Sequence, residues 1–379
     1  MEEVDLLKKL ISINTINSDN GEKIKEIIKD YFGLKLAKVD FEEFEFEGIK
    51  NFVFSFGKGE KCFAFHGHYD VVPVEREKWD TDPFEPVEKD GYIYGRGAAD
   101  MKGGVASLIV AFANLSKNKE VVDKCKVILM VTGDEEQTGL KGMKPTLDKI
   151  VKKFNIIRSL DTEPTSTNKG CDTIKNGRRG VFWLETIITG VPGHASSPSK
   201  FKNPIDGAYL VIENLRNYKL TDKPDMDKTT IVPTMVHSDG GAYNVVPTTA
   251  KIKIDMRYNY GTDPVLFMKN IETLLMKNGF GVEFKHAPID AAFKNTDPKY
   301  EKQLVEIVKD VIGFIPSLET TGGTSDARFF TSLGIPSLEI GPRGYSNNIH
   351  GNNERVAIED IVNTRKIAEL AVIKWVEEL

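Results

Sequence analysis

Four short apolar runs, each followed by a polar or glycine-containing loop, constrain the fold of this sequence most strongly. They are KCFAF (61–65), KVILMVT (126–132), FNIIRSL (154–160) and IPSLEIG (335–341). Each has the length and the continuous apolar character of a strand that is buried on both faces. Helical patterns separate them, and the clearest lie at 100–116, 300–313 and 358–378. This alternation predicts an α/β sheet with helices on both of its faces.

The middle of the chain departs from this alternation. Strand patterns at 177–193, 249–259 and 281–289 enclose helical segments such as 203–217, in the order β-α-β-α-β. Such a set is sufficient for a small α+β domain inserted into a larger one. A chain of 379 residues is also too long for one ordinary core. We therefore predict a larger domain in two parts, 1–175 and 291–379, with an inserted domain at 176–290.

Composition excludes several classes of function. The net charge of −5 gives no electrostatic reason to expect a nucleic-acid partner. The three cysteines (Cys62, Cys125 and Cys171) are far apart and are typical of free thiols in a reducing compartment. No basic segment leads into an apolar one near the start, and the apolar stretch at 103–115 is too short to span a bilayer. We expect a cytoplasmic protein that binds neither nucleic acid nor a membrane.

Histidines and carboxylates gather where the predicted strands end. In chain order, the four runs are followed by His66, His68 and Asp70, by Asp134, Glu135 and Glu136, by Asp161 and Glu163, and by His350 and Glu354. A further acid, Asp100, ends the loop YGRGAAD and starts a helix. Ligands of open α/β sheets bind beyond the carboxyl ends of the strands. We therefore expect these five loops to meet at one edge of one sheet.

Histidine and carboxylate ligands without cysteine are typical of a catalytic zinc, cobalt or manganese site. Residues i and i+2 leave a strand end on the same side, so Asp70 can accept the second ring N–H of His68 and fix its tautomer. Glu135 and Glu136 point in different directions, so one can bind metal while the other stays free as a base. Asp100 is a natural candidate for a carboxylate shared by two metals.

The residues alone leave alternatives open. HGH could supply one histidine ligand or two, so the role of His66 is undecided at this point. His237 and His286 lack acidic partners in a motif, and we expect them to be structural. The Asp-Glu-Glu segment could be a helix start favoured by the helix dipole. GRGAAD resembles part of a dinucleotide fingerprint, but it lacks the third glycine and a long buried strand before it.

Seven segments occur in an order that resembles the M20 family of metallopeptidases and deacylases. They are HGHYDVVP, GRGAADMKGG, TGDEEQTG, DTEPTS, GVPGHASSP, GGTSDARF and IHGNNERV, and they lie between residues 62 and 356. The most similar branch is that of succinyl-diaminopimelate desuccinylase and acetylornithine deacetylase. The resemblance implies a mixed-sheet zinc-hydrolase catalytic domain that holds two metal ions, usually zinc, with cobalt or manganese as alternatives. It also implies that the inserted α+β domain is a lid through which the protein forms a homodimer.

The resemblance implies a role for individual residues. His68 and Glu163 would bind one metal, Glu136 and His350 the other, and Asp100, followed by a cis peptide, would bridge them. Asp70 would orient His68, and Glu135 would be the general base. His194 would reach the active site of the partner subunit and stabilise the oxyanion there. His66 falls where the family needs no ligand.

Substrate contacts are implied as well, at Arg178, Asn244, Arg257, Gly323 and Thr324. The segment from Gly341 to His350 is two residues longer than the usual desuccinylase pattern. Asn347 and Asn348 are therefore alternatives for an asparagine that the pattern expects there. The arginine of GGTSDARF favours a substrate that carries a carboxylate.

The implied function is the hydrolytic removal of a succinyl or acetyl group from a small N-acyl amino acid, such as N-succinyl-diaminopimelate or N-acetylornithine. A di- or aminopeptidase of the same fold is one alternative, and a non-catalytic metal-binding relative is another. The intact Glu135 argues against the second alternative, because a binding protein needs no general base.

Overall fold

The computed structural model describes residues 1–35 and 39–379, and the chain divides into two compact units. Unit 1 comprises Met1–Asn176, Asn295–Glu319 and Ser325–Leu379, and unit 2 comprises Gly177–Lys294 and Thr320–Thr324. The boundaries at 176/177 and 294/295 lie near the expected 175/176 and 290/291. The segment Thr320–Thr324, which the sequence placed in the larger domain, belongs to unit 2 instead. One reason is the Thr320 hydroxyl, which accepts the Asp227 N–H and donates to the Asp227 carboxylate.

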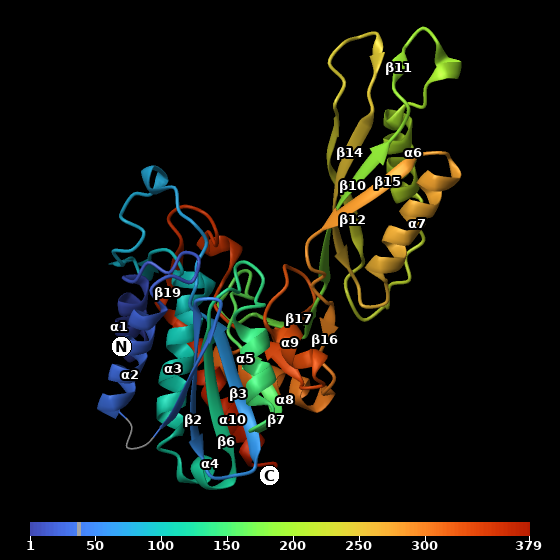
Figure 1. Cartoon of the computed structure of the whole chain (residues 1–379). Helices are drawn as coiled ribbons and strands as arrows, with labels where there is room; N and C mark the ends of the chain where they lie inside the picture. Colours follow the sequence, from blue (N-terminus) through green and yellow to red (C-terminus); the bar gives the residue numbers. More distant parts are fainter. Residues whose placement is uncertain (36–38) are drawn as a thin grey trace. The chain divides into compact units, whose positions relative to one another are not determined.

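An eight-stranded mixed sheet forms the middle of unit 1 (Figure 1). Its order is β1 (Asp40–Phe46), β2 (Ile49–Gly57), β6 (Lys126–Thr132), β3 (Lys61–His68), β7 (Asn155–Asp161), β18 (Ser337–Glu339), β8 (Thr173–Lys175) and β17 (Ser317–Glu319). The strand β3 pairs in parallel with β6 and β7, and β7 pairs in parallel with β18. The carboxyl ends of these four strands therefore lie at one edge, as predicted. A small sheet of β4 (Val87–Lys89), β5 (Tyr92–Tyr94) and β19 (Arg355–Ala357) accompanies it.

Helices cover both faces of the large sheet (Figure 1). One face packs against α1 (Glu2–Ile11), α2 (Gly21–Lys35), α3 (Gly103–Leu115), α4 (Lys119–Lys124), α8 (Pro298–Ile312) and α10 (Ile358–Val376). The other packs against α5 (Met143–Ile150) and α9 (Ala327–Ser332). The strand β3 contributes side chains to the cores on both faces. Phe63 and Phe65 belong to the core on the face of α3, and Cys62 and Ala64 belong to the core on the face of α5. This is the two-residue period of a strand buried on both faces.

The helix α3 lies in the middle of the first core. Together with the preceding turn η2 (Ala98–Lys102) it is long and apolar enough to cross a membrane by length and composition, but 94% of it is buried inside the protein. Such burial is typical of the core helix of a folded domain. A Cβ atom at Gly104 would lie 2.3 Å from the Thr162 carbonyl oxygen. Glycine therefore allows the start of α3 to approach the loop that follows β7.

Unit 2 contains a four-stranded antiparallel sheet and two helices. The sheet has the order β12 (Thr230–Ser238), β14 (Thr249–Tyr258), β10 (Gly180–Thr189) and β15 (Gly281–His286). The helices α6 (Pro204–Arg216) and α7 (Pro264–Lys277) contribute with it to one core. The short strands of this unit are β9 (Gly177–Arg178), β11 (Gly193–His194), β13 (Val245–Val246) and β16 (Phe293–Lys294). The predicted fold class, an α/β mixed sheet with an inserted α+β domain, is confirmed.

The strand β12 was not predicted from the sequence. Pro233 lies within it, and the register shifts between Pro233 and Met235. Because proline cannot donate to a strand ladder, it is confined to edge strands and irregular positions. The strand β12 is such an edge, which is why it has neither a buried apolar run nor a clean alternation.

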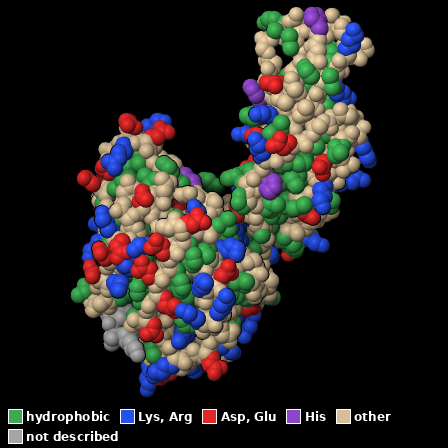
Figure 2. Space-filling model, viewed as in Figure 1, with side chains coloured by type: hydrophobic (Ala, Val, Ile, Leu, Met, Phe, Trp, Pro, Cys, Tyr) green, Lys and Arg blue, Asp and Glu red, His purple; other side chains and the backbone are tan. Residues whose placement is uncertain are grey.

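Charged side chains of both signs are mixed over one face of the molecule. On the face that Figure 2 shows, Asp and Glu side chains are interspersed with Lys and Arg. This mixture agrees with the small net charge of −5. The view offers no broad basic surface of the kind that nucleic-acid binding uses.

Candidate metal centre

Five side chains of unit 1 form two groups at the carboxyl edge of the sheet. His68, Asp100 and Glu163 form one group, and Asp100, Glu136 and His350 form the other. In each group the potential ligand atoms lie within 4.8 Å of one another. These are the five residues expected to bind metal, and Asp100 belongs to both groups, as expected of a bridging carboxylate.

The three contacts with Asp100 and Glu163 are longer than ordinary hydrogen bonds and fit two ligands of one metal, whereas the His350–Glu136 contact is also short enough for a hydrogen bond. His68 Nε2 lies 3.4 Å from Asp100 Oδ1 and 3.5 Å from Glu163 Oε1. His350 Nε2 lies 3.3 Å from Asp100 Oδ2 and 3.1 Å from Glu136 Oε2. Ligands about 2.0–2.2 Å from one tetrahedral ion are separated by about 3.3–3.6 Å. His68 Nε2 is buried without a hydrogen-bond partner among the described residues, as a metal-ligand atom would be.

The tautomer of His68 is fixed by acceptors on the Nδ1 side of its ring. The strand β3 continues to His68, beyond the predicted end at residue 65, and so holds the ring rigidly. His68 Nδ1 lies 3.0 Å from the backbone carbonyl of Asp70 and 3.4 Å from its carboxylate. Both partners are acceptors, so the proton is on Nδ1 and Nε2 is free to bind metal. His66 belongs to neither group: its Nδ1 lies 3.2 Å from Asp161 Oδ2, and its ring stacks on Phe330.

Glu135 and Glu136 are held by the same aspartate. The carboxylate of Asp70 accepts the backbone N–H of Glu135 at 3.3 Å and that of Glu136 at 3.2 Å. The side chain of Glu136 belongs to a ligand group, whereas that of Glu135 belongs to neither. Glu135 Oε2 is still only 3.8 Å from His68 Nε2. One glutamate is therefore placed as a ligand, and its neighbour lies beside the centre without being part of it.

The charges of the centre perturb one another strongly. Burial and the charge of Asp100 raise the pKa of Glu163 to about 8. Burial and the charge of Glu163 raise the pKa of Glu135 well above its ordinary value. Hydrogen bonds with Asp100 and Glu136 raise the pKa of His350 to about 11. Without a cation, protons compensate the crowded carboxylates, so metal binding must release protons.

Two residues that support the loop after β6 were not assigned that role from the sequence. Asp134 has a φ of +66° and accepts hydrogen bonds from the Thr138 hydroxyl and the Lys141 N–H. Arg328 is buried and donates to the carbonyl oxygens of Ser325 and Thr138, both at 2.8 Å. The arginine of GGTSDARF therefore anchors the loop that carries Glu135 and Glu136. These two contacts are with backbone carbonyls, and the interpretation that this arginine favours a carboxylate in the substrate stays a prediction. The pair Gly133-Asp134 directly after a strand is a turn signal that could have identified Asp134, because aspartate tolerates a positive φ.

Two further features concern the loop that ends at Asp100. The peptide bond between Asp100 and Met101 is cis, as the resemblance implied. Glu354 lies at the same edge but belongs to neither group, because its carboxylate accepts the backbone N–H groups of Gly97, Ala99 and Asp100.

The residues expected to contact substrate lie in unit 2. His194 is exposed, and its Nε2 is 3.4 Å from the Asn244 amide. Arg178 donates to the Gly323 carbonyl at 3.3 Å. Two others complete the set: Arg257, which pairs with Asp255, and Thr324, whose buried hydroxyl has no hydrogen-bond partner among the described residues.

The two asparagines proposed as alternatives in unit 1 differ in exposure. Asn347 is buried and donates to the Arg343 carbonyl, whereas Asn348 is exposed and has a φ of +57°. Asn348 is therefore the more accessible of the two, although its amide donates to the Asn352 carbonyl at 3.4 Å.

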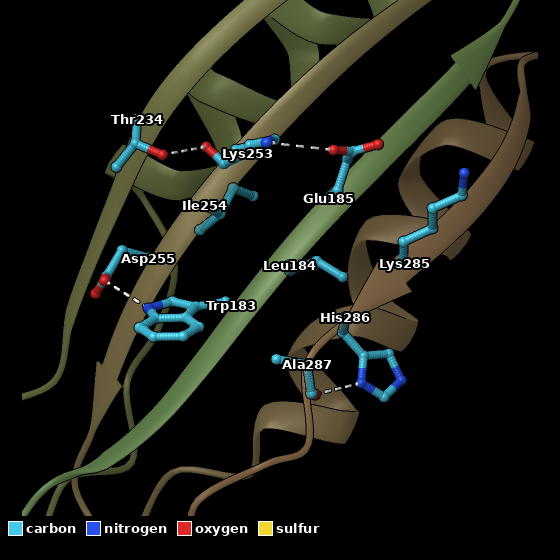
Figure 3. A pocket seen from close by; sticks show the side chains of 10 residues that line it. All are labelled: Trp183, Leu184, Glu185, Thr234, Lys253, Ile254, Asp255, Lys285, His286 and Ala287. Atoms are coloured by element: carbon cyan, nitrogen blue, oxygen red, sulfur yellow. Dashed lines mark hydrogen bonds and ion pairs between the residues drawn. The ribbon is translucent and has the colours of Figure 1, made fainter. Parts of the chain in front are cut away.

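A shallow hollow of about 440 Å³ lies on the sheet of unit 2 (Figure 3). Trp183, Lys253, Lys285 and His286 are among the residues that line it, and the Trp183 indole donates to Asp255. None of the residues of the two ligand groups lines this hollow. We therefore place the chemistry at the edge of the large sheet.

Comparison with known proteins shows what the chain is similar to. The chain is 33% identical over 380 residues to a protein named succinyl-diaminopimelate desuccinylase from Nautilia profundicola, with 99% of this chain and 100% of the relative covered. A protein of the same name from Helicobacter pylori is 31% identical over 393 residues, with both chains fully covered.

Solved structures share the fold. An M20 family metallo-carboxypeptidase from Sulfolobus solfataricus superimposes with a TM-score of 0.79 at 20% identity, with both chains fully covered. A dinuclear metal binding peptidase of the M20 family from Bacillus subtilis gives a TM-score of 0.71 at 18% identity, with 98% of this chain and 97% of that chain covered. The model of the peptidase family M20/M25/M40 matches residues 64–374. With this match over most of its length, the chain belongs to the peptidase family M20/M25/M40 and is a hydrolase of that family.

Proposed function

We propose that this protein is a dinuclear-metal amidohydrolase that removes the succinyl group from N-succinyl-diaminopimelate or a closely related N-acyl amino acid. The name shared by relatives that are 31–33% identical over the full chain supports the substrate class. The observation that carries the proposal is the place of Glu135, which lies 3.8 Å from His68 Nε2 yet outside both ligand groups. A protein that only stored or bound metal would need no such carboxylate.

The ligand set supports two metal ions. His68 and Glu163 would hold one ion and Glu136 and His350 the other, with Asp100 between them. We propose zinc, because nitrogen and carboxylate donors at these separations suit it, and cobalt or manganese could replace it in the same set. Two ions bound here would lower the pKa of a water molecule and polarise the amide carbonyl of the substrate.

Glu135 moves the proton. We propose that it accepts a proton from the attacking water and then delivers it to the nitrogen of the leaving amine. The backbone of Glu135 is held by Asp70, so its carboxylate starts from a fixed position beside the centre. The products are succinate and the free amino group of diaminopimelate.

His194 stabilises the oxyanion in this proposal. The Ser196 N–H donates to His194 Nδ1 at 3.2 Å, so the proton of the neutral ring is on Nε2. In this tautomer Nε2 does not accept from the Asn244 amide 3.4 Å away and can donate to a developing oxyanion. We propose that His194 of the partner subunit acts at each site, which contributes about 2.7–4 kcal/mol to transition-state stabilisation. Arg178, Asn244, Arg257, Gly323 and Thr324 would bind the carboxylates and backbone of the substrate.

A homodimer through unit 2 follows from this role of His194. Support comes from β12, an edge strand on which Val232 and Val236 are 51% and 53% exposed. A second copy could cover these side chains and pair with the open edge. We also propose a cytoplasmic location, which agrees with three buried cysteines that form no disulfide.

A substrate panel tests the proposed function. Zinc-loaded full-length protein is assayed on N-succinyl-diaminopimelate, N-acetylornithine, N-acetyl-lysine and a simple dipeptide, with a chelator-treated sample as the control. We expect a chelator-sensitive preference for the succinyl compound. A preference for an acetyl compound would keep the deacylase chemistry but change the substrate, and a preference for the dipeptide would overturn the deacylase assignment.

A further inference from the structure

Glu354 is almost completely buried although it carries a carboxylate, with 1% of its surface exposed. Its two oxygens accept four hydrogen bonds from one short loop. Oε2 accepts from Arg96 Nη1 at 2.8 Å and from the Gly97 N–H at 2.9 Å. Oε1 accepts from the N–H groups of Ala99 at 2.9 Å and Asp100 at 3.0 Å. One side chain thus binds the loop that presents the shared carboxylate of the metal centre.

The main chain of Glu354 binds the same loop. Its carbonyl oxygen accepts the Gly95 N–H at 2.9 Å. The loop also needs Gly97, whose φ is +82° and where a Cβ atom would lie 2.7 Å from a Val71 methyl group. Glu354 therefore takes up the N–H groups of Gly95, Gly97, Ala99 and Asp100, which leaves the loop little freedom to shift.

The position of Asp100 matters to both ligand groups. Its Oδ1 is 3.4 Å from His68 Nε2, and its Oδ2 is 3.3 Å from His350 Nε2. A displacement of the Asp100 backbone would change both distances at once. The N–H that Glu354 accepts is the N–H of Asp100 itself, so the restraint acts directly on the residue that both groups share.

Glu354 also connects Asp100 to the segment that carries His350. The two residues His350 and Glu354 are four positions apart. Between them, the Asn353 amide exchanges hydrogen bonds of 2.9 and 3.0 Å with the backbone N–H and the carboxylate of Asp80. The short segment from His350 to Glu354 is thus fixed at Asn353 and at its end. Two of the three members of the Asp100–Glu136–His350 group depend on this arrangement.

A purely structural role is the alternative. The buried ion pair of Glu354 with Arg96, whose guanidinium lies 5.2 Å from the Trp79 ring, could serve only to hold the fold together. An ion pair alone, however, would not need three backbone N–H groups of the loop that ends at Asp100.

We propose that Glu354 is a positioning residue of the metal centre, which fixes the Asp100 carboxylate between the two ligand groups before any metal is bound. The proposal rests on the metal centre of the proposed function. It does not depend on which acyl amino acid is the substrate. Partners of metal ligands in this position commonly change metal affinity or activity by roughly 10–100-fold when they are replaced.

The first test compares Glu354→Gln with Glu3→Gln in the full-length protein. Glutamine keeps the size of the side chain but replaces one acceptor oxygen by an amide that cannot accept the loop N–H groups. Glu3 is a matched control. It lies in α1, is also buried, and accepts a hydrogen bond of 3.0 Å from Arg365. It belongs to neither ligand group.

Zinc binding is measured by calorimetry, together with the absorption spectrum of the cobalt-loaded protein, kcat, KM and Tm. For Glu354→Gln we expect both zinc sites to be weakened, because both groups share Asp100. The site of Glu136 and His350 should be weakened more, roughly 10–100-fold, with an altered cobalt spectrum and a lower kcat at little-changed KM. For Glu3→Gln we expect wild-type zinc binding. If Glu354→Gln bound zinc at both sites with wild-type affinity and differed only in a lower Tm, Glu354 would have a structural role alone and the proposal would be wrong.

A second test needs no variant, so it holds even if Glu354→Gln does not fold. Hydrogen exchange is measured for the amides of Gly97, Ala99 and Asp100 in the metal-free and zinc-loaded wild-type protein. We expect these amides to be protected already without metal, because Glu354 binds them. Free exchange that stops only when zinc is added would overturn the proposal. Zinc affinity, the cobalt spectrum, Tm and hydrogen exchange are all measured without substrate, so failure of the proposed activity would leave both tests readable.

Discussion

Asp70 and Glu136 are joined by a hydrogen bond from the Glu136 N–H to the Asp70 carboxylate, at 3.2 Å. The same carboxylate lies 3.4 Å from Nδ1 of the buried ring of His68. One side chain therefore orients a histidine of the first ligand group and the backbone of a glutamate of the second. This relationship makes Asp70 a link between the two halves of the metal centre.

Replacement of Asp70 by alanine should impair both ligand groups. His68 would keep its 3.0 Å contact with the backbone carbonyl at position 70, but Glu135 and Glu136 would lose the acceptor of their N–H groups. We expect kcat/KM to fall roughly 10–100-fold, with weaker zinc binding. Asp123→Ala, which removes a surface ion pair with Lys58, is the control and should stay at wild-type level. Wild-type activity in Asp70→Ala would show that the carboxylate is dispensable.

Glu135 and Glu136 should separate turnover from metal binding. Glu135→Gln should lower kcat about 10²–10⁴-fold while the zinc content stays at two equivalents, because the loss is that of a proton acceptor. Glu136→Gln should lose zinc from the Asp100–Glu136–His350 group. The measurements are zinc content by elemental analysis and kcat on the same samples. The opposite pattern would mean that the roles of the two neighbours are exchanged.

Subunit complementation tests whether His194 acts across a dimer. His194→Ala and Glu135→Gln are each expected to be nearly inactive. When the two are mixed and allowed to exchange subunits, a mixed dimer contains one site with Glu135 of one chain and His194 of the other. We expect activity to return in the mixture in proportion to the mixed dimers. A mixture as inactive as its components would place His194 in the site of its own chain or outside catalysis.

Asp297 should make the free energy of unfolding depend on pH. This residue caps α8 by accepting the N–H groups of Lys299 and Tyr300, and it pairs with Arg158 at 2.8 Å. Although burial opposes ionisation, these contacts lower the pKa of Asp297 below its ordinary value of 3.8. A lowered pKa in the folded state means that the stabilisation is complete above the unfolded-state pKa and is lost as the pH falls towards the folded-state pKa.

Asp297→Asn isolates this contribution, because asparagine is also a good N-cap but cannot ionise. In urea unfolding, wild type should be more stable than the variant at pH 7, and the difference should shrink as the pH falls from about 5 to 3. A difference that is constant with pH would show that the charge of Asp297 does not contribute.

The sequence predicted the metal centre well because its ligands follow parallel strands. His68 ends β3, Glu135 and Glu136 follow β6, and Glu163 follows β7, so the rule that parallel strands share a carboxyl edge brings them together. The existence of β3, β6, β7 and β18 and of the inserted unit followed from the apolar runs, whereas some strand ends differ from the prediction and β12 was not predicted. The assignment of each ligand to a group came from the resemblance to the family.

The supporting contacts could not be predicted in this way. Glu354 binds backbone N–H groups that lie 254–257 positions earlier in the chain, and the Arg328 contact with Thr138 spans 190 positions. Such contacts produce no periodic pattern in the sequence, because they depend on the positions of two loops that are distant in the chain. The contacts of Arg328 could not be predicted for the same reason: an arginine in a motif looks the same whether it is buried against carbonyl oxygens or open to a substrate.

The central claim is that two metal ions share Asp100. Crystals of the zinc-loaded protein, measured on both sides of the zinc absorption edge, would locate the ions directly. We predict two anomalous peaks about 3.5–4 Å apart, with one oxygen of Asp100 on each, His68 at one peak and His350 at the other. A single peak at saturating zinc, or two peaks without Asp100 between them, would contradict the account.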